Sequence, residues 1–275
     1  MSFLEMLVAA SRRNRSLLCI GLDPLASLLP SGIEPTAEGL LAFNRAIIEA
    51  TADLVCAYKP NSAFYEALGA QGIELLRATI AAVPPDIPVI LDAKRGDIAS
   101  TSSQYAQAVF DVLGAHAVTI NPYLGGDSIE PFTRDPQRGC FILCRTSNPG
   151  GSEVQELALA DGRPLYLHIA QLVAERWNSA GNCGLVVGAT YPRELAEVRR
   201  LCPSLPILVP GIGAQGGSLQ EAVRAAVDAR GELAIINVSR AILYASRGSD
   251  FASASRAEAQ RLRMAIEQIC SQAAA

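Results

Sequence analysis

The stretch PVILDAKRGD, residues 88–97, decides the fold of this 275-residue chain. Its apolar half shows no alternation with polar residues, which is typical of a parallel strand covered on both faces. GLVVGAT (184–190) and PILVPGI (206–212) repeat this pattern. Asp92 and Lys94 end the first run, and because they are two residues apart their side chains point to the same face of the strand. The sequence therefore predicts a buried parallel sheet whose strands end in polar residues or glycine.

Eight such runs recur along the chain, with helix-like segments between them. The predicted strands are 17–23, 55–60, 88–94, 117–121, 140–146, 183–189, 206–212 and 233–239. The predicted helices are 36–52, 64–83, 99–113, 163–180, 191–201, 218–229 and 251–272, with a short crossover near 127–136. Thr36 is the expected N-cap of the first of these helices. Eightfold alternation favours an α/β fold of the (β/α)8 TIM-barrel type over an open doubly wound sheet, and we expect residues 1–275 to form a single domain.

The charge and composition of the chain argue against several classes of binding partner and cofactor. A formal charge of −4 and a pI near 5.3 give no basic field for nucleic acid or an anionic membrane. The N-terminal stretch lacks the order of a signal peptide, so we expect a cytoplasmic protein that neither enters nor binds a membrane. The seven cysteines are scattered in apolar segments, which favours buried free thiols over disulfides or metal ligands. Dinucleotide and ATP loop motifs are missing, so we expect no cofactor and no metal.

Five charged residues lie at or just after the ends of three successive predicted strands. They are Asp23 in GLDP, Lys59 in YKPN, and Asp92, Lys94 and Asp97 in ILDAKRGD. Active sites of TIM barrels lie at the carboxyl ends of the strands. Charges at the ends of apolar strands cost desolvation unless they pair, and alternating lysines with carboxylates supply that pairing. Convergence from three strands favours a catalytic cluster over an ordinary salt-bridge network at the rim.

The turns after the last two predicted strands favour a phosphate site. Barrels often hold phosphate at this position with loop amides and an arginine. The glycines of PGIGAQGG (210–217) allow close approach of the backbone, and Gln215 can donate a side-chain amide. Arg240 can meet phosphate oxygens with two hydrogen bonds.

These motifs together resemble the orotidine 5′-phosphate decarboxylase family. DAKRGDIAST (92–101) is similar to its D-x-K-x-x-D-I-x-x-T signature, and TSNPG (146–150) resembles its pyrimidine-contacting loop. PGIGAQGG with VSRAI (238–242) resembles its phosphate site, so the likeness covers nearly the whole chain. DAKRGDI and TSNPG look most like the divergent second branch of the family. One departure is Ser239, where the family commonly has glycine.

The resemblance implies a cofactor-free carboxy-lyase that converts orotidine monophosphate to uridine monophosphate and carbon dioxide in pyrimidine synthesis. It implies that Lys94 donates a proton to C6, that Asp92 lies beside the substrate carboxylate, and that Lys59 orients Asp92. It also implies a homodimer with shared active sites, in which Asp97 and Thr101 reach into the partner's pocket. The residues implied to bind substrate are Asp23 and Lys59 for ribose, Ser147 and Pro149 for the pyrimidine, and Gln215 and Arg240 for phosphate.

Three other functions remain open from the sequence. A magnesium-dependent sugar-phosphate decarboxylase or aldolase of the same barrel superfamily also carries a D-x-K-x-x-D motif, and magnesium dependence would distinguish it. A Schiff-base aldolase acting through Lys94 or Lys59 would be trapped by borohydride, although neighbouring carboxylates favour a charged, non-nucleophilic amine. A non-catalytic nucleotide-binding barrel would bind uridine monophosphate without turnover.

Overall fold

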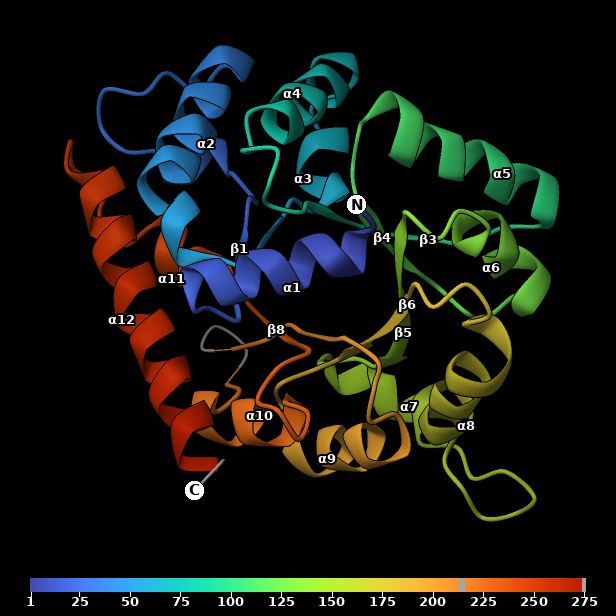
Figure 1. Cartoon of the computed structure of the whole chain (residues 1–275). Helices are drawn as coiled ribbons and strands as arrows, with labels where there is room; N and C mark the ends of the chain where they lie inside the picture. The colour runs from blue at the N-terminus through green and yellow to red at the C-terminus, as the bar shows by residue number, and fades with distance from the viewer. Residues whose placement is uncertain (213–215, 274–275) are drawn as a thin grey trace.

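A computed structural model describes residues 1–212 and 216–273 and shows eight parallel strands in a nearly closed barrel (Figure 1). The strands are β1 (Leu18–Gly21), β2 (Ala57–Lys59), β3 (Ile90–Arg95), β4 (Ala117–Ile120), β5 (Gly139–Arg145), β6 (Cys183–Val187), β7 (Ile207–Val209) and β8 (Ala234–Val238). Their order is β2-β1-β8-β7-β6-β5-β4-β3, and isolated bridges such as Tyr58 with Val89 connect β2 to β3. The predicted TIM-barrel class is confirmed, and each predicted strand overlaps an observed one, although β3 ends and β5 begins one residue beyond the predicted range.

Helices surround the barrel in Figure 1, and most follow the predicted ranges. They are α1 (Phe3–Asn14), α2 (Ala37–Thr51), α3 (Ser62–Glu66), α4 (Ala70–Ala81), α5 (Ala99–Gln107), α6 (Gly126–Thr133), α7 (Ser152–Gln155), α8 (Leu165–Leu172), α9 (Pro192–Leu201), α10 (Leu219–Ala226), α11 (Arg240–Leu243) and α12 (Phe251–Ala273). The Thr36 cap is confirmed, since its Oγ1 accepts a hydrogen bond from the backbone N–H of Gly39 at 3.1 Å. The single helix predicted over 64–83 is wrong. Gly69 has a φ of +67°, a left-handed conformation that separates α3 from α4.

Two apolar layers make up the core. The inner layer receives one buried residue from each strand: Cys19, Ala57, Ile90, Ala117, Phe141, Val186, Leu208 and Ile235. Phe3 and Leu7 of α1 pack against this layer, with the Phe3 ring edge-on to Phe141 at a centroid distance of 5.6 Å. Helix α1 therefore closes the amino end of the barrel, across which it lies in Figure 1. The carboxyl ends of the strands remain available for a site.

The structure also describes the thiols, the apolar character of the helices and the potential metal ligands. Six of the seven thiols are buried, as their apolar segments predicted. Within residues 1–212 and 216–273, no helix is long and apolar enough to cross a membrane. No cluster of three potential metal-binding side chains occurs in that part of the chain.

Candidate active site

A cavity of about 770 Å³ opens at the carboxyl ends of the strands. Six residues singled out from the sequence line it: Asp23, Lys59, Asp92, Lys94, Ser147 and Arg240. They come from segments more than 200 residues apart, and the closure of the barrel brings them to one opening. Gln215 lies outside the described residues.

Asp92 is the centre of the charged cluster. Its Oδ2 accepts a hydrogen bond from Lys59 Nζ at 3.0 Å, and its Oδ1 accepts from Lys94 Nζ at 2.6 Å. Thr119 Oγ1 of β4 also donates to Oδ1, at 2.9 Å. The side chains of Lys59 and Asp92 are only 4% and 12% exposed, whereas that of Lys94 is 48% exposed. Both lysines line the cavity, and Lys94 is the one whose side chain is more open to a ligand there.

The two buried charges stabilise each other's ionised forms. Burial alone would raise the pKa of the Asp92 carboxyl, but Lys59 and Lys94 hold that pKa well below its ordinary value. Burial would lower the pKa of Lys59, but the carboxylates of Asp92 and Asp23 raise it above its ordinary value. Asp92 is therefore an anion and Lys59 a cation at neutral pH.

The backbone at Lys94 is held in an unusual conformation. Its φ is +47°, in the left-handed region that a residue with a side chain seldom occupies. The pairing of β3 with β4 shifts register between Leu91 and Arg95, and the Lys94 N–H donates to Thr119 Oγ1 at 2.9 Å. Such strain costs about 1–3 kcal/mol and concentrates at functional sites. Thr119 thus fixes both the carboxylate of Asp92 and the backbone of Lys94.

Asn61 is a second residue of the cluster that the sequence did not single out. Its backbone N–H donates to Asp23 Oδ1 at 3.0 Å, and its side-chain amide lies 3.5 Å from Asp92 Oδ2. The buried hydroxyl of Tyr65 donates to the carbonyl of Leu22 at 2.7 Å, which fixes the chain next to Asp23. The only sequence signal for Asn61 is its position two residues after Lys59 at a strand end.

Three of the predicted site residues do not line this cavity: Asp97, Thr101 and Pro149. Asp97 lies in the turn before α5, where its Oδ1 accepts from the Ile98 N–H at 2.7 Å. Pro149 begins a short 3-10 turn, and its neighbours Ser147, Asn148 and Gly150 line the cavity instead.

Ser239 and Gly21 fit together at the side of the cavity formed by β8 and β1. A Cβ atom on Gly21 would lie 1.9 Å from Ser239 Oγ, so the glycine makes room for the serine side chain. The next residue, Arg240, begins α11 and is exposed where it lines the cavity. Ser239, which stands where the family commonly has glycine, is thus accommodated by Gly21, and Arg240 still lines the cavity.

The sequence and the fold are both similar to those of known proteins. The family described as "Orotidine 5'-phosphate decarboxylase / HUMPS family" matches residues 16–254. A protein of Roseiflexus sp. (strain RS-1) named "Orotidine 5'-phosphate decarboxylase" is 59% identical over 266 residues, which cover 97% of each chain. A protein of the same name from Herpetosiphon aurantiacus is 59% identical over 94% of this chain and 95% of its own. The solved structure of Leishmania donovani OMP decarboxylase matches with a TM-score of 0.87 and 44% identity over 98% of this chain and 99% of that one.

Proposed function

Since the chain belongs to the orotidine 5′-phosphate decarboxylase / HUMPS family, it is a carboxy-lyase for orotidine monophosphate, and we propose that Lys94 donates the proton that replaces the carboxylate. The observation that supports this role most strongly is the half-exposed Lys94 ammonium, 2.6 Å from Asp92 Oδ1 in the cavity. The reaction fits a place in uridine monophosphate synthesis, in the cytoplasm.

The hard step is the departure of carbon dioxide from C6. The bond between C6 and the carboxylate breaks, the electron pair remains on C6, and a proton must then reach that carbon. An ammonium fixed beside C6 stabilises the developing negative charge and supplies this proton, after which solvent reprotonates the amine. Lys94 is suited to this because its ammonium is held by Asp92 on one side and open to the cavity on the other.

Asp92 serves the reaction through its position and its charge. It accepts hydrogen bonds from Lys59, Lys94 and Thr119, so its carboxylate has little freedom to move away. A substrate carboxylate placed beside this anion is destabilised in the ground state, and the strain is relieved as carbon dioxide leaves. Lys59 orients Asp92 and, with Asp23, is available to the ribose hydroxyls.

The remaining contacts hold the rest of the nucleotide. Ser147 has a hydroxyl for the pyrimidine edge, and Pro149 shapes the turn that carries it. Arg240, together with Gln215, is assigned to the phosphate, where a guanidinium can form two parallel hydrogen bonds. Binding energy from the phosphate lies far from the reacting bond, yet it can position the reacting groups.

We also propose that the active enzyme is a homodimer in which Asp97 and Thr101 enter the partner's cavity. Neither residue lines the cavity of its own chain. Large apolar side chains are exposed nearby on the turns after β3 and β4, with Ile98 at 60%, Tyr123 at 84% and Leu124 at 51%. Contiguous exposed apolar side chains often mark a protein interface.

Loss of the orotidine monophosphate absorbance in the presence of excess chelator tests the function. Purified protein is expected to consume this substrate and form one uridine monophosphate for each molecule consumed, with no added cofactor. A magnesium-dependent enzyme of the same superfamily would instead stop in chelator and recover with added magnesium. A non-catalytic nucleotide-binding barrel would bind uridine monophosphate and leave the substrate unchanged.

A further inference from the structure

Arg145 is a fully buried cation directly behind the cavity. It is the last residue of β5, where the pairing with β6 shifts register between Leu143 and Arg145. Its side chain is 0% exposed and does not line the cavity. A buried guanidinium is costly unless it is paired and hydrogen-bonded, so its partners show which part of the chain it stabilises.

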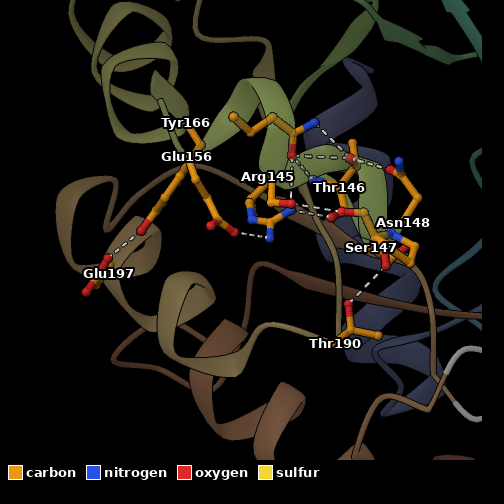
Figure 2. Close-up of polar contacts among 11 residues, drawn as sticks. Arg145, Thr146, Ser147, Asn148, Glu156, Tyr166, Thr190 and Glu197 are labelled. Atoms are coloured by element: carbon orange, nitrogen blue, oxygen red, sulfur yellow. Dashed lines mark hydrogen bonds and ion pairs between the residues drawn. The ribbon is translucent and has the colours of Figure 1, made fainter. Parts of the chain in front are cut away.

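Among the residues that the structure describes, the polar partners of the guanidinium all belong to the segment 146–156 (Figure 2). Nη1 donates to the carbonyl of Thr146 at 3.0 Å and to Gln155 Oε1 at 3.3 Å, and Nη2 forms an ion pair with Glu156. Gln155 in turn accepts a hydrogen bond from the Thr146 N–H at 2.9 Å. Arg145 therefore connects the first residues of this segment to its last ones.

The turn after β6 holds the same segment from the other side. The Tyr191 ring stacks on the Arg145 guanidinium, with the guanidinium carbon 3.6 Å from the ring centroid. Thr190 Oγ1 donates to the carbonyl of Ser147 at 3.3 Å (Figure 2). A Cβ on Gly188 would lie 2.7 Å from that of Ser147, so the backbone approaches Ser147 as closely as glycine allows. Ser147 is thereby fixed between the Arg145 network and the β6 turn.

We propose that Arg145 is a positioning residue for the nucleobase, an inference that rests on the proposed function. Seven residues of the segment it holds line the cavity: Thr146, Ser147, Asn148, Gly150, Gly151, Val154 and Gln155. Arg145 fixes these residues before substrate arrives, so binding does not have to order them. The planar guanidinium is needed because it stacks on Tyr191 while donating in two directions, which a lysine ammonium cannot do.

Gly151 shows how closely the network is packed. A Cβ at this position would lie 2.8 Å from Arg145 Nη1 and 2.9 Å from Gln155 Oε1. The backbone of Gly151 has an ordinary right-handed φ of −59°, so the glycine is explained by this close contact. A side chain at this position would therefore displace the guanidinium or the Gln155 amide.

The test compares the affinities of Arg145→Lys and Glu156→Gln proteins for uridine monophosphate and for ribose 5-phosphate. Arg145→Lys is expected to weaken uridine monophosphate binding by about tenfold or more, since small displacements of positioning groups have large effects. Ribose 5-phosphate has no base, so its affinity should stay within about twofold of wild type. Glu156→Gln removes only the ion pair and should weaken uridine monophosphate by a smaller factor.

Glu153→Gln is the matched control, because this substitution removes the same charge from an exposed residue of α7, the short helix that ends one residue before Glu156. It should leave both affinities unchanged, and thermal unfolding of each variant checks that the protein is folded. A folded Arg145→Lys protein that keeps its uridine monophosphate affinity, or loses both ligands equally, would contradict the positioning role. If Arg145→Lys does not fold, Glu156→Gln decides: a selective loss of uridine monophosphate supports the inference, and no loss contradicts it.

The two proposals fail in different ways. Wild-type turnover of orotidine monophosphate tests the proposed function by itself. A wild-type protein that binds both ligands but does not decarboxylate would overturn the function, while the comparison of the two affinities would still decide the role of Arg145.

Discussion

Lys94→Ala is expected to lower kcat for orotidine monophosphate by at least about 10²–10⁴-fold, the usual contribution of a positioned general acid. The fold should persist, because Asp92 keeps its bonds to Lys59 and Thr119 when Lys94 is truncated. Affinity for ribose 5-phosphate should also persist, since Lys94 is assigned to C6 and not to the phosphate. The measurement is kcat for the variant beside its ribose 5-phosphate affinity.

Arg77→Ala is a suitable control for loss of one positive charge. Arg77 is 58% exposed on α4 and pairs with Glu74 on the same helix, outside the cavity. Its removal should leave kcat unchanged. A Lys94→Ala protein with activity within about tenfold of wild type would remove Lys94 from the proton-donor role.

Mixing inactive Asp97→Ala and Lys94→Ala proteins is expected to restore about a quarter of wild-type activity. In a mixed dimer, one composite pocket receives both altered residues and the other receives both intact ones. Complete exchange of equal amounts makes about half of all dimers mixed, and each has one good pocket of two. The measurement is kcat per pocket after exchange, compared with that of each parent.

The control for this experiment is a demonstration that the two proteins exchange subunits. Tagging one parent allows mixed dimers to be recovered and assayed directly. Mixed dimers as inactive as their parents would place Asp97 in the same pocket as Lys94, against the shared-site proposal.

The barrel was predictable because its signals are local. An apolar run such as 184–190 and a capping residue such as Thr36 can be recognised without knowing what they contact. The break at Gly69 was missed because an isolated glycine is tolerated within a helical pattern, and only the structure reveals its left-handed backbone.

The site was only partly predictable, since several of its contacts depend on closure of the barrel. Asp92 and Lys94 are neighbours in sequence, and their contact follows from strand geometry. Thr119 lies in an apolar strand and reaches Asp92 only because β4 pairs with β3. Arg145 follows an apolar run, and nothing local indicates that Glu156 turns back to pair with it.

The most direct test of the central claim is a reaction in D₂O, with the uridine monophosphate product examined by proton NMR. Replacement of the carboxylate by a proton from an exchangeable ammonium predicts one deuterium at C6 in every product molecule and none at C5. Each product molecule should be matched by one molecule of carbon dioxide. The claim is that this chain decarboxylates orotidine monophosphate by direct protonation of C6. Deuterium at C5 would contradict it, and so would recovery of unchanged substrate after incubation with the folded wild-type protein.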